Sequence, residues 1–465
     1  MSAGAASYVP VSGAGSTWSA NALDQWRRNV NQYGMRIDYQ AGGSSDGRNQ
    51  FRNGTVDFAV SEIPYGLKDG NVVDQPPARP YAYMPIVAGG TAFMYNLKIG
   101  PNRVTQLRLS GEVIAKIFTG AITSWADPAI KADNPGLTLP GLKVVPVVRS
   151  DGSGTTAQFT TWLAAEYPDI WNAYCQKVGR STPCGFTSNF PSGPGFVAQS
   201  GSLGVSGYVA QEQSVGAITY VEYSYAKSAG FPVVKVRNKA NYYILPTAQA
   251  VAVGLLGARI NPDLSQNLTG VYGNADKRAY PLSSYSYMII PTSNDNGFSN
   301  EKGYTLADFA VYFLCQGQQQ ADALGYSPLP LNLVKAAFDQ VRRIPGAVVE
   351  NITLAKCNHP TFSADGSNTL AKTAPQPPPC DAQGPSQCGT PAENAGGGTA
   401  PTDPGTGGES GSGAGSGGGS GSGSGSGAGS GAGPGAGDGS GAAAGTVDAG
   451  GNAGGGGTDP AAGGV

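Results

Sequence analysis

The sequence predicts an α/β fold with two lobes and a ligand site between them, followed by a disordered C-terminal tail. Strand-like and helix-like segments alternate through the first 360 or so of the 465 residues, which is the pattern of α/β domains. Three loops rich in glycine and serine lead into helix-like segments. In the tail, 33 of the 77 residues from 389 to 465 are glycine, and such a composition cannot bury enough apolar surface to fold.

The individual elements follow from hydrophobic periodicity. Between residues 19 and 32, Leu23, Trp26 and Val30 recur on one face of a helix. An apolar run over residues 144–148 is typical of a buried strand. Other strands are expected over residues 7–11, 35–40, 56–60, 86–96, 217–220, 231–236 and 287–290. Other helices are expected over residues 46–52, 111–118, 155–165, 306–315 and 332–342.

Three loops indicate an anion-binding site. Their sequences are Gly-Ala-Gly-Ser-Thr-Trp at 13–18, Gly-Gly-Ser-Ser at 42–45 and Arg-Ser-Asp-Gly-Ser-Gly-Thr-Thr at 149–156. Free N–H groups at a helix N-terminus, together with small hydroxyls, hold a compact oxyanion without many cationic side chains. The third loop follows the first two by about a hundred residues, so a ligand that contacts all three must lie between two lobes.

Arg149 is the only cation in these loops and stands at the end of an apolar strand. Its guanidinium can bind two oxygens of an anion, and Asp151 is placed to orient it. Ser153, Thr155 and Thr156 offer hydroxyls at the start of the next helix. The alternatives are an ordinary Arg–Asp pair at a strand end and hydroxyls that act only as helix caps. Capping alone does not account for three such loops.

Glu62 follows the strand-like segment 56–60 and is a candidate for recognising an anion that carries a proton. A carboxylate beside an anion is repulsive unless the anion donates a hydrogen to it. Phosphate at neutral pH carries a proton and sulfate does not, so Glu62 could discriminate between them by a factor of roughly 10⁴. The alternative is a solvated glutamate at the start of a loop. Asp46 is interpreted as a favourable acid in a first helical turn.

Composition and motifs exclude several other functions. The net charge is −2 and no basic run is present, so we expect no nucleic-acid contact. The Gly-x-x-x-x-Gly-Lys-Ser/Thr motif of a P-loop is missing from the sequence. The single histidine, His359, lies far along the chain from the three loops, which argues against a histidine-based triad or a catalytic zinc ion. We expect no cofactor, no metal and no catalytic residue.

The spacing of the six cysteines suggests three disulfides. The expected pairs are Cys175 with Cys184, Cys315 with Cys357, and Cys380 with Cys388. Disulfides indicate an oxidising, extracytoplasmic compartment. Six cysteines allow 15 pairings, and a zinc site made of Cys357, His359, Cys380 and Cys388 is an alternative, although its spacing fits no common zinc finger.

Taken together, these motifs resemble the phosphate-binding proteins of bacterial phosphate ABC transporters. The resemblance rests on the three loops and on Val56-Asp57-Phe58, and it continues in family order through further stretches. These stretches are Ile117-Phe118-Thr119-Gly120, Asn134-Pro135-Gly136-Leu137, Gly-Ala-Ile-Thr-Tyr-Val-Glu-Tyr at 216–223, Tyr280-Pro281-Leu282 and Gly-Tyr-Ser-Pro-Leu-Pro at 325–330. The likeness extends from about Tyr8 to Arg343.

The resemblance implies a type II periplasmic-binding-protein fold with two lobes and a hinge that the chain crosses twice. Lobe I would comprise residues 1–94 and 286–360 and lobe II residues 95–285, while a Cys/Pro-rich extension over 361–388 and the tail over 389–465 are additions. Carried over position by position, phosphate would contact Thr17, the backbone of Trp18, Ser44, Glu62, Arg149, Ser153, Gly154 and Thr155, with Asp151 orienting Arg149. Lobe closure would bury inorganic phosphate, and a membrane ABC permease would receive it.

Two positions depart from the family pattern. Glu62 stands where the family usually has Asp, and Trp18 stands where it usually has Phe. The extra methylene of Glu62 must be absorbed locally, and the larger ring of Trp18 is expected to crowd or reshape the rim of the cleft. Both changes bear on anion selectivity.

The expected location is outside the cytoplasm. We expect an exported monomer in the periplasm, at the cell wall or on the cell surface, with the glycine-rich tail serving as an envelope anchor. Met1 is interpreted as a start methionine placed on a mature N-terminus, and the glycine-rich end is interpreted as having lost a membrane or wall anchor.

We therefore predict a non-enzymatic phosphate receptor, and three alternatives stay open. The first is a secreted phosphatase or phosphotransferase, which would need a nucleophile and a metal or acid. The second is a surface adhesion or scaffold protein that keeps the fold without phosphate affinity. The third is a receptor for another oxyanion or a phosphate ester.

Overall fold

The computed structural model describes residues 8–348, 357–361 and 367–389. Ser7, the first residue of the first predicted strand, lies outside this part of the chain, as do residues 390–465 of the predicted tail.

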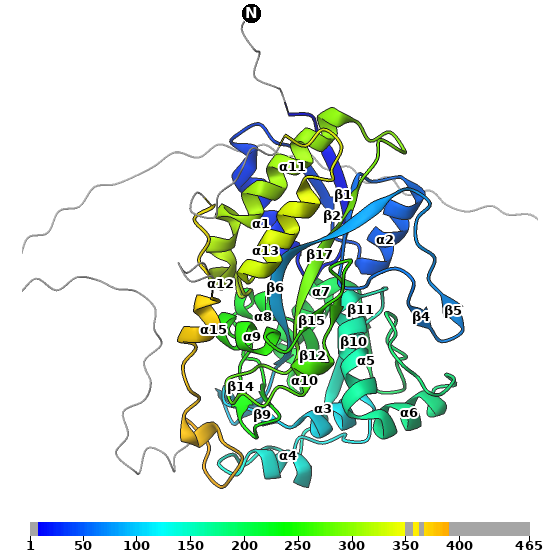
Figure 1. Cartoon of the computed structure of the whole chain (residues 1–465). Coiled ribbons are helices and arrows are strands. Elements are labelled where there is room, and N and C mark those ends of the chain that lie inside the picture. Colours follow the sequence, from blue (N-terminus) through cyan, green and yellow to red (C-terminus); the bar gives the residue numbers. More distant parts are fainter. Residues whose placement is uncertain (1–7, 349–356, 362–366, 390–465) are drawn as a thin grey trace, which may run out of the picture. The chain divides into compact units, whose positions relative to one another are not determined.

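A mixed sheet of eight strands, in the order β11-β10-β12-β6-β17-β3-β1-β2, organises the described residues (Figure 1). Strands β1, β2 and β3 form one parallel group, and β10, β11 and β12 form another. The long antiparallel pair β6 and β17 lies between the two groups and joins them. The strands are β1 (Val11–Gly15), β2 (Ile37–Gln40), β3 (Phe58–Ser61), β6 (Tyr81–Tyr95), β10 (Val145–Arg149), β11 (Val197–Gln199), β12 (Ala217–Glu222) and β17 (Ser283–Pro291).

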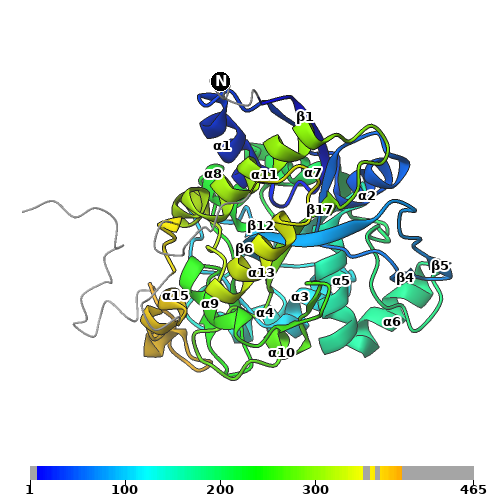
Figure 2. The ribbon, with the colours of Figure 1, turned by 45° about the horizontal axis from the view of Figure 1, so that its top comes forward.

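Helices cover this sheet, and Figure 2 shows α13 beside β6, with α11 next to α13. The α-helices of residues 20–177 are α1 (Ala20–Asn31), α2 (Ser44–Asn53), α3 (Gly111–Phe118), α4 (Pro128–Asp133), α5 (Gly154–Glu166) and α6 (Pro168–Lys177). The later ones are α7 (Gly201–Ala210), α8 (Tyr223–Ser228), α9 (Ala248–Leu255), α10 (Thr269–Tyr272), α11 (Asn300–Leu314), α12 (Ala321–Leu324), α13 (Leu331–Val341) and α15 (Thr369–Thr373). The 3₁₀ helices among the described residues are η1 (Glu212–Ser214), η2 (Gln316–Gln320) and η3 (Pro379–Asp381).

Within the described part of the chain, four small sheets accompany the main one. A three-stranded sheet contains β9 (Arg108–Leu109), β13 (Lys235–Arg237) and β14 (Tyr243–Ile244). Three hairpins pair β4 (Lys68–Asp69) with β5 (Val72–Val73), β7 (Lys98–Ile99) with β8 (Asn102–Arg103), and β15 (Arg259–Ile260) with β16 (Gln266–Asn267).

The predicted helices agree closely with the structure. Helix α1 buries Leu23, Trp26 and Val30 as expected from their spacing, and the Trp26 ring stacks on Phe313 of α11 with centroids 5.0 Å apart. Helix α3 spans the predicted residues 111–118. The helix predicted to begin at Leu306 instead begins at Asn300, where the Ser299 side chain caps it.

Two strand predictions were displaced. The first strand covers Val11–Gly15 instead of residues 7–11, because the glycines that suggested a loop are needed inside the strand. A Cβ on Gly13 would lie 2.2 Å from the Phe58 ring of β3, so only glycine permits this packing. The strand predicted over 231–236 is reduced to Lys235–Arg237.

The three predicted disulfides are confirmed: Cys175–Cys184, Cys315–Cys357 and Cys380–Cys388. The zinc alternative is therefore wrong, because three of its four proposed ligands are bonded to other sulfur atoms. Within the described ranges, every helix is too short or too polar to cross a lipid bilayer.

Candidate functional site

Four strand-to-helix connections lie around one location. In each of them the carboxyl end of a parallel strand leads into a helix: β1 into α1, β2 into α2, β10 into α5, and β11 into α7. The sequence predicted the first three. The fourth, at the start of α7, brings in a serine that was not predicted to belong to the site.

Glu62 lies in the interior directly after β3, with a side chain that receives three hydroxyl groups. Its Oε2 accepts hydrogen bonds from Ser16 Oγ (2.8 Å) and Ser44 Oγ (2.9 Å), and its Oε1 accepts one from Ser286 Oγ (2.7 Å). Only 1% of the residue is exposed, so the alternative of a solvated glutamate is wrong. Burial raises the pKa of the Glu62 carboxyl, and the three hydroxyls oppose that rise.

The N-terminus of α5 meets this carboxyl at Gly154. A Cβ on Gly154 would lie 1.9 Å from Glu62 Oε2 and 2.4 Å from Ser44 Oγ. Because any other side chain would collide with both groups, glycine is required there. This contact places the predicted residues Ser44, Glu62 and Gly154 side by side.

Arg149 is buried at the end of β10 and is held by Asp151. Its Nε donates to Asp151 Oδ1 (2.6 Å), and its Nη2 donates to Asp151 Oδ2. The Gly201 N–H at the start of α7 donates to the same carboxylate (2.9 Å). Burial raises the pKa of Asp151, but the Arg149 guanidinium and the Gly201 N–H outweigh burial and hold that pKa below its usual range. The predicted orienting role of Asp151 agrees with this geometry.

Ser202 connects Arg149 to the first loop. Its Oγ lies 2.7 Å from Thr17 Oγ1 and accepts a long bond of 3.4 Å from Arg149 Nη1. Its backbone N–H donates to Thr17 Oγ1 (3.3 Å). The first and third loops therefore come together through the N-terminus of α7. Thr17 and Arg149 use Ser202 as a shared partner.

The hydroxyls at the start of α5 have different roles. Ser153 caps the helix, since its Oγ accepts the Thr156 N–H at 3.1 Å. Ser153 therefore caps the helix, and this bond uses its hydroxyl oxygen only as an acceptor. Thr155 Oγ1 is buried and has no hydrogen-bond partner among the described residues. A buried hydroxyl without a partner is costly, so the Thr155 hydroxyl is suited to bind a ligand atom.

Trp18 does not lie at the rim of a cleft, which corrects the expectation for this ring. The residue is fully buried, and its ring packs at 5.7 Å from Tyr326 and against Gly89 of β6. Its backbone N–H donates to Ser16 Oγ at 2.9 Å. A contact between this N–H and an anion would therefore require the bond to Ser16 to be shared or exchanged.

Further contacts join the two sides of the site around these residues. The Ser45 N–H donates to Gly152 O (3.1 Å), and Ser45 Oγ donates to Ser188 Oγ (3.2 Å). Asp69 of the β4–β5 hairpin accepts bonds from Arg180 Nη2 (2.7 Å) and Thr187 Oγ1 (2.8 Å). These contacts cover the site, and its polar side chains are shielded from water.

Comparison with known proteins gives the family. Residues 2–316 match the model of the PBP superfamily domain. The chain is 33% identical over 329 residues to the phosphate-binding protein PstS of Xylella fastidiosa strain Temecula1, and the alignment covers 70% of this chain and 83% of that protein. It is 32% identical over 364 residues to the phosphate-binding protein PstS of Methanocaldococcus jannaschii, with 73% and 87% covered. This chain belongs to the PstS family.

Solved structures confirm the fold of this PstS family member. A high-affinity periplasmic phosphate-binding protein, PfluDING, solved with bound phosphate, aligns with a TM-score of 0.54 at 19% identity and covers 74% of this chain and 100% of its own. The phosphate-binding protein of Stenotrophomonas maltophilia aligns with a TM-score of 0.51 at 18% identity, with 71% and 93% covered.

Two residues of the site were missed by the sequence analysis. Ser202 belongs to a Gly-Ser pair similar to those in the predicted loops, and Ser200-Gly201-Ser202 could have been recognised as a fourth loop of this kind. Ser286 lies in β17 at a register shift between Ser286 and Tyr287. Its signal was a serine within a strand that is buried along its whole length, where a hydroxyl needs a partner.

Proposed function

We propose that this protein is an extracytoplasmic receptor that captures inorganic phosphate between two lobes and delivers it to a membrane ABC permease. One observation carries the proposal: a buried arginine, fixed by Asp151, belongs to the same closed site as a buried carboxylate that faces the N-terminus of a helix. The arginine supplies charge for an anion, and the carboxylate accepts a hydrogen from it. Hydrogen phosphate meets both requirements, whereas a fully deprotonated oxyanion meets only the first.

The proposed ligand set is the one implied by the family resemblance. Phosphate would be contacted by Thr17, the backbone of Trp18, Ser44, Glu62, Arg149, Ser153, Gly154 and Thr155. We add Ser202 as a positioning residue that holds Arg149 and Thr17. The two relatives reported above are phosphate-binding proteins, and binding followed by release requires no catalytic group.

The proposed lobes follow the sheet. Residues 1–94 with 286–360 would form lobe I, and residues 95–285 would form lobe II, so that both boundaries fall in β6 and β17. These two strands join the parallel groups of the main sheet, which supports their role as the hinge. Three disulfides support an oxidising location outside the cytoplasm.

Calorimetric titration of phosphate-stripped protein with phosphate and, separately, sulfate at pH 7 tests the function. We expect micromolar or tighter binding of phosphate and no measurable binding of sulfate. Equal binding of both anions would contradict the proposal that Glu62 recognises the proton of hydrogen phosphate. Binding of neither anion by correctly folded protein would contradict the receptor function and favour a scaffold role.

Replacing Ser202 with alanine should weaken phosphate binding about three- to tenfold, because Arg149 and Thr17 lose a shared hydrogen-bond partner worth about 0.5–1.5 kcal/mol. The matched control is Ser206→Ala on the same helix, whose hydroxyl donates only to carbonyl oxygens of its own turn. Dissociation constants and melting temperatures of both variants decide the matter. Similar phosphate affinity in the two variants would remove Ser202 from the site.

A further inference from the structure

A C-terminal strap, formed by residues 357–361 and 367–389, connects distant parts of the molecule. Its first part is attached beside α11. The Cys315–Cys357 disulfide links it to the end of that helix. Gln319 Nε2 donates to Asn358 O (2.8 Å), and Thr361 Oγ1 donates to Leu329 O (3.0 Å). All of these partners belong to proposed lobe I.

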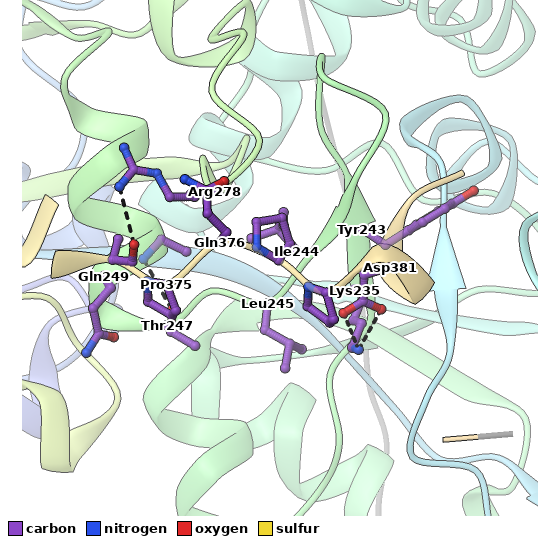
Figure 3. Close-up of a pocket in the computed structure, with 14 residues that line it drawn as sticks. Lys235, Tyr243, Ile244, Leu245, Thr247, Gln249, Arg278, Pro375, Gln376 and Asp381 are labelled. Atoms are coloured by element: carbon purple, nitrogen blue, oxygen red, sulfur yellow. Dashed lines mark hydrogen bonds and ion pairs between the residues drawn. The ribbon is translucent and has the colours of Figure 1, made fainter. Parts of the chain in front are cut away.

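The second part of the strap lies on proposed lobe II. Helix α15 packs on α9, and Arg278 Nη1 donates to the Ala371 and Ala374 carbonyls at 3.1 and 3.3 Å. Figure 3 shows Arg278 on one side of the proline run that follows, and the ion pair between Lys235 Nζ and Asp381 (2.8 Å) on the other. The prolines line a cavity of about 180 Å³, and polar contacts before and after them hold this stretch in place.

The end of the strap supplies partners for a buried cation. Arg108 is 1% exposed, and its Nη1 donates to the carbonyls of Cys380 and Ser386, both at 3.0 Å. The Cys380–Cys388 disulfide closes the loop that carries these two carbonyls. Gln387 Nε2 donates to Gln106 O at 2.7 Å. Without the strap, a buried guanidinium would lose these acceptors, which is costly.

The strap is separated by one helix from the strands that join the two proposed lobes. Helix α9, which carries α15, also packs on β6 and β17. The match to the superfamily model ends at residue 316, so the strap lies beyond the part of the chain that the family fold accounts for. Its anchors on the two sides are a disulfide at one end and buried ionic and polar bonds at the other.

We propose that this strap is a third connection between the lobes, in addition to β6 and β17, and that it restricts how far the lobes open. The proposal rests on the two-lobe phosphate receptor proposed above. The contacts that anchor the strap to both proposed lobes are present in this arrangement. Opening the lobes would strain or break some of these contacts, so they favour the closed arrangement over an open one. The strap should therefore slow phosphate release and limit the extension of the phosphate-free protein.

The test removes the lobe I anchor with the double variant Cys315→Ser/Cys357→Ser. The matched control, Cys175→Ser/Cys184→Ser, removes a disulfide that lies wholly within lobe II and outside the strap. A third variant, Asp381→Asn, weakens the lobe II anchor and keeps every disulfide. Phosphate dissociation is followed by stopped flow, and the radius of gyration of phosphate-free protein is measured by small-angle X-ray scattering.

We expect phosphate to leave the Cys315→Ser/Cys357→Ser variant about tenfold faster than the control, and its phosphate-free form to have a larger radius of gyration. Asp381→Asn should change both quantities in the same direction and by less, and it decides the matter if the double variant does not fold. Release rates and radii equal to those of the control, with only the melting temperature lowered, would overturn the proposal. If wild-type protein binds no phosphate, the receptor function fails, and the scattering comparison still decides whether the strap restrains the lobes.

Discussion

Replacing Arg149 with alanine should weaken phosphate binding by at least about 100-fold. A phosphate dianion enclosed by the four helix N-termini would lose the cation of the three predicted loops, and Asp151 would be left as an unpaired negative charge beside it. Removing one partner from a buried ionic contact costs about 3–5 kcal/mol, and every 1.4 kcal/mol is a factor of ten in affinity. Calorimetric titration with phosphate measures the loss.

Two further variants separate charge from geometry. Arg149→Lys keeps the positive charge but cannot donate in parallel to both oxygens of Asp151, so we expect an intermediate affinity. Arg237→Ala, which removes a more exposed arginine whose carboxylate partner is 3.9 Å away, should leave phosphate binding unchanged. If Arg149→Ala bound phosphate as tightly as Arg237→Ala does, the site would have been assigned to the wrong residues.

Local sequence patterns predicted most of the parts of this site but not how they meet. The helix starts that follow the second and third loops could be predicted because glycine, serine and threonine act at short range, through caps and free N–H groups. Thr17 and Ser202 are 185 positions apart, and their contact depends on the packing of two groups of strands. No periodicity within either segment carries that information.

The first strand shows the opposite problem, in which a local rule gave the wrong answer. Glycine usually marks a turn, and this placed the Gly-Ala-Gly run in a loop. In the structure Gly13 lies in β1, where the Phe58 ring of a neighbouring strand occupies the space of a side chain. The identity of that neighbour is a property of the sheet order. The contact between the strap and Arg108 could not be predicted either, because the partners of Arg108 are backbone carbonyls some 270 positions away.

Replacing Glu62 with glutamine should abolish the discrimination between phosphate and sulfate. The wild-type carboxylate offers only lone pairs, so sulfate would place an oxygen against it with no hydrogen between them. Glutamine offers an N–H₂ group that can donate to a sulfate oxygen. We expect sulfate affinity to rise by at least about 100-fold, because the buried negative charge that repels sulfate is removed, while phosphate affinity changes by less than about tenfold.

The control for this variant is Glu222→Gln. Glu222 is also a fully buried glutamate, and burial raises the pKa of its carboxyl, but its carboxylate accepts the Ser224 N–H at the start of α8. It should keep the wild-type selectivity. Competition between sulfate and phosphate, measured by calorimetry for the three proteins, gives the result. Sulfate exclusion that survives in Glu62→Gln would show that another group enforces it.

The selectivity for phosphate over sulfate should also depend on pH. Burial raises the pKa of Glu62 above the ordinary glutamate value, so this carboxyl takes up a proton at a higher pH than an exposed glutamate does as the solution is acidified. Once protonated, it donates a hydrogen bond instead of accepting one, and a sulfate oxygen becomes a suitable partner. Wild-type affinity for sulfate should therefore rise as the pH falls toward and below that pKa. The Glu62→Gln variant has no carboxyl to protonate at this position, so its affinity for sulfate should change little with pH. If sulfate affinity depended on pH in the same way in both proteins, the Glu62 carboxyl would not be the group that distinguishes a protonated anion from an unprotonated one.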